Sequence, residues 1–317
     1  MSKAYDTIVV GAGPSGSASA YHLARAGLRV LLIDKEKFPR DKVCGDGLNS
    51  RALSLLSEIG ITPKDLKAHG GIQIVRYRHF TDEREGVDSL RDSISGSMLG
   101  LGISRFKLDE LIRQRAIAVG AEWLGKAEVT AVSCNSQPRV FMVRTDGRES
   151  YRARSLVISS GAQSTLHNPF LVQRSLWKPS AIGIRSYFQV LSPHNCRTFD
   201  FFYLSYLPGG YGWIFPVRDD LYNVGIWVAR VKFRNLKECY AQFIHEVVTP
   251  CLPADWKMVT QPRGAMIGTR PEICSHDPFA LLVGDAAHLA DPVSGEGISH
   301  ALESGKSSTS HFLPLLS

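Results

Sequence analysis

The stretch from residue 6 to residue 34 constrains the fold of this 317-residue chain more than any other. It begins with the apolar run Ile8–Val10, which predicts a buried strand. Three glycines follow in G-x-G-x-x-G spacing, namely Gly11, Gly13 and Gly16. In that pattern the first glycine permits a tight turn and the second lets a pyrophosphate approach the main chain. The third lets a helix pack closely on the strand.

The residues after these glycines complete a nucleotide-binding unit. Ala-rich Ser15–Ala26 predicts a helix whose first N–H groups and positive dipole end face the phosphates. Gly27 ends this helix, Val30–Ile33 predict a parallel strand, and Asp34 stands where an acid accepts a hydrogen bond from an adenosine ribose. Because all these parts fall at the right spacing, the sequence predicts a Rossmann-type dinucleotide site rather than an ordinary glycine loop.

A second segment, residues 281–305, lies near the other end and reads LLVGDAAHLADPVSGEGISHALESG. It predicts a strand, an exposed Asp285, a proline-containing loop and a helix opened by glycines. Asp285 is expected to approach the ribityl chain or pyrophosphate of a cofactor as a charged hydrogen-bond acceptor. The segment with Pro292 and Gly295–Ile298 would bring main-chain N–H groups and a helix start against a flavin and stabilise the negative charge of its reduced form. Together the two segments predict the two halves of one FAD site.

Composition describes a soluble globular protein, 44% hydrophobic and 21% charged, with room for two domains. No apolar run approaches the roughly 18 residues of a membrane span, and the N-terminal apolar stretch reads as a strand rather than a signal peptide. The six cysteines lack C-x-x-C pairing and metal-ligand spacing with His. Reduced thiols, a cytoplasmic location and no metal site are therefore expected.

The net charge of +7 leaves three interpretations open, namely contact with anionic membrane lipid, an acidic electron-transfer partner, or no specific partner. Scattered lysines and arginines favour the last. No nucleic-acid-binding motif is visible, so no nucleic-acid partner is expected.

Between the two FAD segments the predicted elements change character. The early ones are a helix at 104–119 and strands at 128–133, 140–144 and 154–159. From Ala181 to Val231 the pattern becomes long, aromatic and antiparallel. Residues 235–249 look helical, and Phe279–Val283 look like a strand. We therefore expect an α/β fold in which a Rossmann-type FAD-binding domain (1–68, 100–165 and 275–317) carries an inserted, largely antiparallel β-sheet substrate domain (69–99 and 166–274).

Four ordered patches resemble the geranylgeranyl reductase family of FAD-dependent oxidoreductases, which have the p-hydroxybenzoate-hydroxylase fold. They are GAGPSG with Asp34, FPRDKVCGDGL (Phe38–Leu48), LPGGYGWIFPV (Leu207–Val217) and GDAAHLADPVSGEGISHALESGK (Gly284–Lys306). The first is shared by many nucleotide-binding proteins. The second and third are more specific, because the family has a Cys-Gly pair beside the flavin and a Tyr-x-Trp-x-Phe-Pro strand along its substrate cavity.

The motifs and the resemblance together imply a set of cofactor contacts. For FAD these are Gly11, Gly13, Pro14, Ser15, Gly16, Asp34, Lys35, Arg40, Cys44, Gly45, Gly47, Arg105, Val129, Gly284, Asp285, Pro292, Gly295, Gly297 and Ile298. Arg105 taken by itself would be a solvated helix-start residue. The electron donor stays open between NADPH and a ferredoxin-type protein.

The resemblance also implies catalytic and substrate-lining residues. Cys44 would lie near the reactive face of the flavin, where it donates a proton or shapes the pocket; alone, it would read as a small core residue. Tyr211, Trp213 and Phe215 share one face of a strand and, with Pro216, would line a polyprenyl cavity. Without the resemblance such a stripe is ordinary core. Tyr211 is the second candidate proton donor.

The chain departs from the family pattern in two ways. Ser160 and His167 stand where hydroxylase-fold proteins often have Asp and Arg, which argues against direct reduction by NADPH. Only about twenty residues follow Gly297, and SSTSHFLPLLS at the end looks like a short tail. Family members usually continue into a C-terminal helical portion that helps to enclose a lipid substrate. The substrate chamber of this chain is therefore expected to be open, completed by another chain, or lost.

Three functions follow from these observations. The first is reduction of carbon–carbon double bonds in a geranylgeranyl or polyprenyl chain of an isoprenoid lipid, with peripheral membrane contact at most. The second is an aromatic monooxygenase. A halogenase is disfavoured for two reasons. This chain has CGDG where many flavin halogenases have Gly-Glu-Ser, and it has no lysine from Ala68 to Phe106 to hold a haloamine. The third is a shortened FAD-binding protein without independent turnover.

Overall fold

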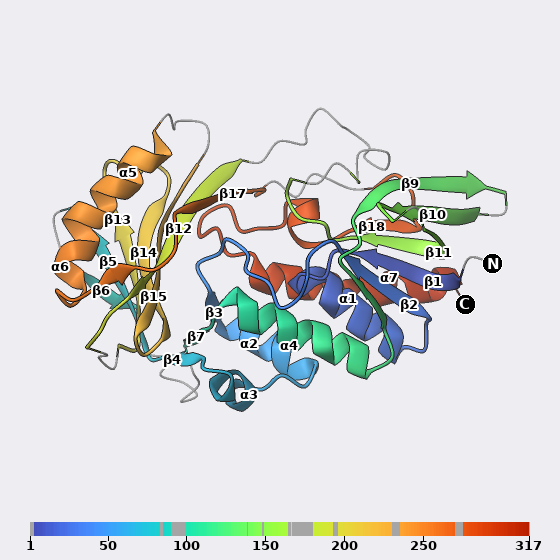
Figure 1. Cartoon of the computed structure of the whole chain (residues 1–317), viewed down its shortest axis with the longest axis horizontal. Coiled ribbons are helices and arrows are strands. Elements are labelled where there is room, and N and C mark those ends of the chain that lie inside the picture. The colour runs from blue at the N-terminus through green and yellow to red at the C-terminus, as the bar shows by residue number, and fades with distance from the viewer. Residues whose placement is uncertain are drawn as a thin grey trace.

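The structure, a computed structural model, has two lobes with a sheet in each (Figure 1). It describes residues 3–82, 85–89, 99–137, 139–147, 149–163, 166, 180–192, 196–229, 235–269 and 275–316. One lobe combines helices with a mostly parallel sheet, and the other is built on an antiparallel sheet with helices on one side. The predicted fold class, a Rossmann-type FAD-binding domain with an inserted β-sheet domain, is confirmed.

The N-terminal unit forms as predicted. Strand β1 (Ala4–Val10) leads into helix α1 (Pro14–Arg25), and β2 (Val30–Asp34) returns parallel to β1. The last four residues of β1 and all of β2 are buried, because helices cover one face of this sheet and further strands and loops cover the other.

Segments far apart in sequence complete this sheet. In the described residues its strand order is β8-β2-β1-β11-β10-β9, and β18 also pairs with β11. The added strands are β8 (Glu122–Gly125), β9 (Val129–Ser136), β10 (Arg139–Thr145), β11 (Ser150–Ile158) and β18 (Ala280–Leu282). Strand β18 is parallel to β11. The chain therefore returns to the first lobe after it has built the second.

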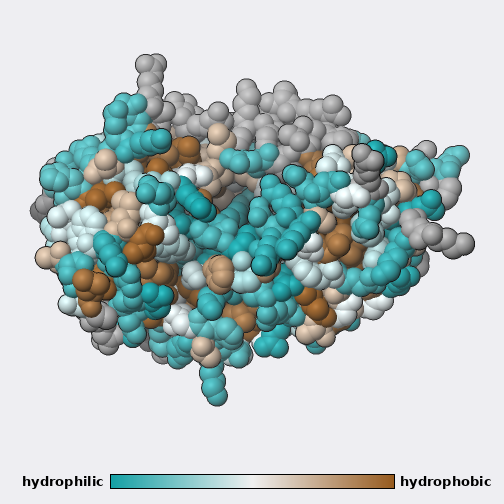
Figure 2. Space-filling view, in the orientation of Figure 1, coloured by the Kyte–Doolittle hydropathy of each residue, from teal (hydrophilic) through white to brown (hydrophobic). Residues whose placement is uncertain are grey.

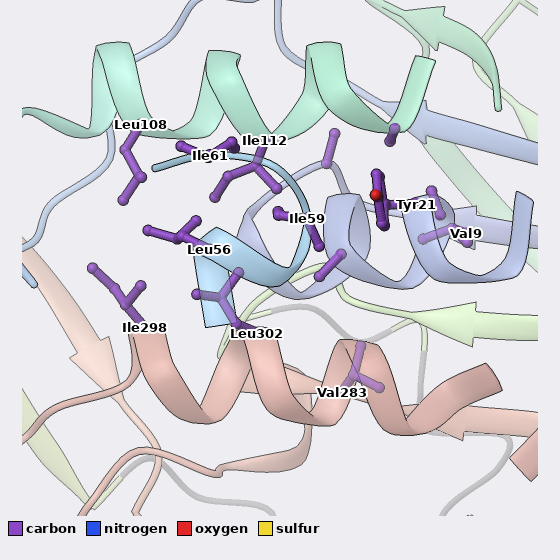
Figure 3. Close-up of a cluster of buried hydrophobic side chains, with 14 of the residues drawn as sticks. Val9, Tyr21, Leu56, Ile59, Ile61, Leu108, Ile112, Val283, Ile298 and Leu302 are labelled. Carbon is purple, nitrogen blue, oxygen red and sulfur yellow. The ribbon is translucent and has the colours of Figure 1, made fainter. Parts of the chain in front are cut away.

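Helices from both ends of the chain share the core of the first lobe (Figure 3). Besides α1 these helices are α2 (Ser50–Glu58), α3 (Pro63–Ala68), α4 (Arg105–Ala118) and α7 (Ile298–Leu316). Leu108 and Ile112 on α4 point towards Leu56 of α2, while Leu302 of α7 approaches from the opposite side. The predicted helix at 104–119 is thus α4, and Leu108, Ile112 and Ala116 lie on its buried face.

The second lobe contains an eight-stranded sheet in the order β16-β12-β15-β14-β13-β5-β6, with β17 also on β12. Its strands are β5 (Arg76–Thr81), β6 (Glu85–Ser89), β12 (Ala181–Gln189), β13 (Thr198–Tyr203), β14 (Tyr211–Arg218), β15 (Leu221–Ala229), β16 (Lys257–Met258) and β17 (Arg263–Ile267). The predicted aromatic strands between 181 and 229 are confirmed. All neighbours in this sheet are antiparallel except β13 and β5.

Shorter elements join and cover the two sheets. A three-stranded sheet of β3 (Gly47–Asn49), β7 (Gly100–Gly102) and β4 (Ile72–Ile74) lies between the lobes (Figure 1). The predicted helix at 235–249 is α5 (Leu236–Phe243), a π-helical turn η4 (Ile244–Val248) and α6 (Thr249–Cys251). A 3₁₀ turn, η5 (Gly284–Ala287), follows β18.

The surface is mixed rather than uniformly apolar. On the face drawn in Figure 2, hydrophilic residues predominate between the lobes, and hydrophobic residues lie in small groups. In the described part of the chain, no helix combines the length and hydropathy that a membrane crossing needs.

The predicted C-terminal tail was wrong, because α7 continues through it to Leu316. Serines, a threonine and Pro314 lower the intrinsic helix propensity of this stretch, which made it look irregular. Tertiary packing overrides that preference. Ser308, Phe312 and Leu316 recur every fourth residue and are buried on one face of the helix.

Substitution of Phe312 would test whether the end of α7 belongs to the core. Its side chain is fully buried among the helices of the first lobe. Phe312→Ala should lower the free energy of unfolding by about 3–5 kcal/mol, because it removes a buried ring and leaves a cavity. Leu315→Ala, at a position 37% exposed, should cost less than about 1 kcal/mol. Urea unfolding followed by tryptophan fluorescence measures both. Equal losses in the two variants would contradict the packing described.

Candidate functional site

A cavity with about 970 Å³ of empty space, counted out to open solvent, lies where the two lobes meet. Its first-lobe side comes from five separate segments. These contribute Gly13, Pro14 and Ser15; Lys42, Val43, Cys44 and Gly45; Arg105; Ser159 and Gly161; and Asp285, Ala290, Gly295, Gly297, Ile298 and Ala301. The mixture of polar and apolar groups that line it is typical of a cofactor site.

The other side of the cavity is an aromatic wall, by which we mean Tyr211, Trp213, Phe215 and Trp227. The first three alternate along β14, so they share one face of the sheet as predicted. Trp227 reaches the same face from β15, where it pairs with Tyr211. Gly183, Ala265 and Ile267 of β12 and β17 also line the cavity.

The glycine turn before α1 brings its backbone to the cavity. Gly11 has a φ of +102°, which only glycine adopts easily. A Cβ on Gly16 would lie 1.8 Å from the carbonyl oxygen of Gly11, so helix and turn touch backbone to backbone. A Cβ on Gly13, in contrast, would meet only Arg40 at 3.7 Å. The packing roles predicted for the three glycines match this geometry, and Gly13 faces open space.

The N-termini of α1 and α7 meet at the cavity, through Ser15 and Gly297. In α1 the cap Gly13 has no side chain, and the N–H groups of Ser15 and Gly16 lie in the first turn, where a helix offers no internal acceptor. Two helix N-termini side by side create positive potential in one cavity.

Charged side chains add to that potential. Lys42 Nζ lies 2.7 Å from Asp285 Oδ2, and this ammonium holds the pKa of Asp285 below its ordinary value. Arg105 is 3% exposed and pairs through two nitrogens with Asp109 at 2.6 and 2.7 Å. Asp109 also accepts from Arg40 at 2.7 Å. Arg105 is therefore buried, which excludes the alternative of a solvated residue at a helix start. Asp285, predicted to be exposed, is instead ion-paired and only partly exposed.

Cys44 lies at the junction of the cofactor side and the aromatic wall. Its sulfur accepts a hydrogen bond from the N–H of Asp46 at 3.4 Å. Burial raises the pKa of the Cys44 thiol, although Arg105 acts in the opposite direction. A Cβ on the next residue, Gly45, would meet Phe215 at 3.4 Å, so this loop touches the aromatic wall directly.

Asp46, behind Cys44, is a fully buried acid. It accepts hydrogen bonds from the Tyr187 hydroxyl and from Asn223 Nδ2, the latter at 2.9 Å. Desolvation outweighs these hydrogen bonds and nearby Arg185, so the pKa of Asp46 rises from 3.8 to about 6. Sequence reasoning did not single out this residue.

The hydroxyl of Tyr211 donates to the backbone carbonyl of Ser294 at 2.6 Å. It therefore ties the aromatic wall to the loop before α7. Burial raises the pKa of Tyr211. A phenol whose proton already binds a backbone carbonyl is poorly placed to donate that proton to a substrate.

Several predicted site residues lie outside the cavity lining: Gly11, Gly16, Asp34, Lys35, Arg40, Gly47, Val129, Pro216, Gly284 and Pro292. Three of these glycines lie in close contacts outside the lining: an added Cβ would meet the Ser159 backbone, the Gly11 carbonyl or the Ser15 side chain, at Gly11, Gly16 and Gly284 respectively. Asp34 is 8% exposed, and its carboxylate accepts from the N–H groups of Ala12 at 2.7 Å and Glu36 at 2.8 Å.

Three more of these residues are placed by their strands, and one lies in solvent. Val129 is buried in the core behind the sheet of the first lobe, and Lys35 is exposed. Gly47, in β3, lies against Phe199, because a Cβ there would approach that ring to 3.0 Å. Pro216 points to the face of β14 opposite the aromatic wall. Ser160 lies beside the lining residues Ser159 and Gly161, and His167 lies outside the described residues.

The cavity includes residues that sequence reasoning did not name, chiefly Lys42, Ser159, Gly161, Gly183 and Trp227. Lys42 lies inside the motif FPRDKVCGDGL and could have been found there. Trp227 could not, since its place depends on the register of β15 against β14.

The comparisons with known proteins agree with this geometry. A family model described as FAD binding domain matches residues 4–249. A menaquinone reductase of Mycobacterium tuberculosis is 34% identical over 95% of this chain and 74% of its own length. A digeranylgeranylglycerophospholipid reductase of Methanocella arvoryzae is 31% identical over 96% of this chain and 76% of its own length.

The chain belongs to the geranylgeranyl reductase family of FAD-dependent oxidoreductases. A solved structure agrees, namely a geranylgeranyl bacteriochlorophyll reductase-like protein of Thermoplasma acidophilum. It is 26% identical, with a TM-score of 0.85 over 97% of this chain and 77% of that one. A flavin-dependent brominase is 18% identical with a TM-score of 0.81, which shows a shared fold only.

The described residues fit FAD as this family's cofactor. An anionic pyrophosphate would fit beside Gly13, where the backbone is open to the cavity and two helix N-termini meet. The positive charges of Lys42 and Arg105 line the same cavity. The same cavity is also lined by Cys44 and the aromatic wall. A planar ring system could lie at that end.

Gly16 tests the cofactor side of the site. Gly16→Ala should lower the free energy of unfolding by about 1–3 kcal/mol, because its Cβ would overlap the Gly11 carbonyl. The displaced turn should also weaken FAD binding by about tenfold or more, which corresponds to about 1.4 kcal/mol. Quenching of flavin fluorescence measures the affinity. In the control Gly147→Ala, the new Cβ would meet only Thr145 Oγ1 at 3.9 Å, so no change is expected. Unaltered FAD affinity in Gly16→Ala would contradict the assignment.

Asp46 predicts a pH dependence of stability. Because its pKa is about 6 in the folded protein and 3.8 ordinarily, the folded state binds the proton more tightly. This stabilisation is complete below about pH 4 and is lost as pH rises through 6, by up to about 3 kcal/mol. Asp46→Asn removes the titration. The stability of wild type relative to Asp46→Asn should therefore fall between pH 4 and 6.5, measured by urea unfolding. A difference independent of pH would contradict a buried, titrating Asp46.

Proposed function

We propose that this FAD-dependent oxidoreductase reduces carbon–carbon double bonds in the geranylgeranyl or polyprenyl chain of an isoprenoid lipid. The observation that carries the proposal is the aromatic wall, which faces the cofactor side of the same cavity. The named relatives act on menaquinone or on a digeranylgeranyl lipid. Both molecules carry a prenyl chain, whereas their head groups have nothing in common.

The aromatic wall suits an alkene chain because it is large, apolar and continuous. Neighbouring ring centroids in it lie 5.9–6.2 Å apart, so little space is left for water between them. Apolar burial of the chain would hold one double bond in place without hydrogen bonds to it. When bound and reduced, FAD supplies the hydride for such a reaction.

Cys44 is the side chain that we propose as proton donor. Its raised pKa keeps the thiol protonated at neutral pH, and it borders the cavity between Arg105 and the aromatic wall. Tyr211 is better suited to holding the loop at Ser294, because its hydroxyl proton is already bound there. We assign it to substrate lining with Trp213 and Phe215.

The test uses the FAD-loaded protein reduced with dithionite under nitrogen and then desalted. It is mixed with either a geranylgeranyl lipid or a menaquinone, exposed to air, and analysed by mass spectrometry. Each saturated bond adds two hydrogens that survive the exposure to air, whereas a reduced quinone ring returns to its original mass. A gain that survives is the expected result with both substrates.

The other outcomes contradict the proposal in different ways. A mass gain with menaquinone that disappears in air indicates reduction of the quinone ring. Oxygen consumption stimulated by a phenol or pyrrole, without hydrogen addition, indicates a monooxygenase. FAD uptake without any reaction indicates a binding protein. Repeating the assay with NADPH or with reduced ferredoxin in place of dithionite identifies the electron donor.

A further inference from the structure

Asn223, a fully buried residue of β15, lies beside the aromatic wall on the same face of the sheet. It pairs with Phe215 of β14, and the ring of Trp213 reaches across to β15 beside it. A Cβ on Gly225 would lie 2.3 Å from Trp213 Cζ2, so the indole covers that glycine. Asn223 itself does not line the cavity, but two of the residues that it binds do.

The carboxamide of Asn223 joins three groups from two lobes. Its Oδ1 accepts from Trp213 Nε1 at 2.9 Å. Its Nδ2 donates to the carbonyl oxygen of Cys44 at 2.7 Å and to Asp46 Oδ2 at 2.9 Å. One acceptor and two donors in a single plane are what an amide offers, and neither a carboxylate nor a hydroxyl could replace it.

The loop that carries Cys44 is held to the same sheet at further points. Asp46 has a φ of +61°, a conformation unusual for a residue with a side chain, and it also accepts from Tyr187 of β12. Arg185, on the same strand, is fully buried and pairs with Asp41 while it donates to the carbonyl of Lys42 at 3.2 Å. Among these contacts, only the Asn223 amide also binds a ring of the aromatic wall.

We propose that Asn223 is a positioning residue that sets the distance between the Cys44 loop and the Trp213 ring. The width of the cavity at this point follows from one rigid amide bonded on both sides. In the reaction proposed above, on which this part rests, that width decides how the double bond lies relative to the proton donor. If Asn223 positions the Cys44 loop, its replacement should change how accessible the Cys44 thiol is. If Asn223 only stabilises the fold, its replacement should lower stability and leave that accessibility unchanged.

The first measurement is the rate at which iodoacetamide alkylates Cys44 in the FAD-loaded protein, followed by peptide mass spectrometry. Asn223→Asp keeps an acceptor for Trp213, loses both donated hydrogen bonds and places a second carboxylate beside Asp46. Cys44 alkylation should accelerate about threefold to tenfold, as expected for the loss of one or two buried hydrogen bonds. Exposed Cys251, which is far in sequence from every substituted position, serves as the internal reference in the same sample.

Two further variants complete the design. Trp213→Phe keeps an aromatic ring but removes the indole N–H together with part of the ring. It leaves both hydrogen bonds from Asn223 to the Cys44 loop in place, so it should accelerate Cys44 alkylation by a smaller factor, about twofold to threefold. Asn135→Asp makes the same chemical change at an exposed position of β9 and should leave the rate unchanged. With a prenyl substrate, Asn223→Asp should lower kcat by about tenfold while KM changes less than about threefold.

The outcomes separate this inference from the proposed function. If wild type reduces no prenyl chain but Asn223→Asp still accelerates Cys44 alkylation, the positioning role stands and the reductase proposal fails. If Asn223→Asp does not fold, as judged by thermal unfolding, Trp213→Phe decides. Cys44 alkylation within the error of wild type in every folded variant would overturn the inference.

Discussion

The contact between α1 and α7 is the interaction on which the rest of this structure depends. A Cβ on Gly305 would lie 2.4 Å from the backbone oxygen of Ser15, and a Cβ on Gly284 would lie 2.6 Å from the Ser15 hydroxyl. Gly305 therefore lets α7 approach α1 almost backbone to backbone, and Gly284 of η5 leaves room for the Ser15 side chain at the start of α1. Because of this approach, helix N-termini almost three hundred residues apart face one cavity, and their dipoles act on the same ligand.

The second lobe gives the cavity its chemical character. The sheet supplies aromatic rings on the side facing the cofactor residues, and buried polar side chains of β12 and β15 fasten the Cys44 loop to that sheet. Buried polar networks of this kind are costly when one partner is missing, so they favour a single arrangement. The distance between Cys44 and the aromatic wall is thereby set by the interface between the lobes.

Family and reaction rest on different parts of the molecule. FAD chemistry follows from the turn at Gly11–Gly16, the segment around Asp285 and the match over residues 4–249. The proposed substrate class rests on the aromatic wall and on relatives whose names refer to menaquinone and to a digeranylgeranyl lipid. The fold alone does not distinguish reductases from brominases, since both share it at similar TM-scores.

Local patterns in the sequence determined the strand–helix–strand unit at the N-terminus, the buried face of α4 and the shared face of Tyr211, Trp213 and Phe215, because spacing alone sets these features. Only tertiary structure decided the rest. Residues 307–316 are helical because Phe312 and Leu316 on one face of this segment pack into the core of the first lobe. The places of Trp227 and Asn223 required the register of β15, and the burial of Asp46 required both lobes. Such contacts join positions far apart in the chain, so no short-range pattern records them.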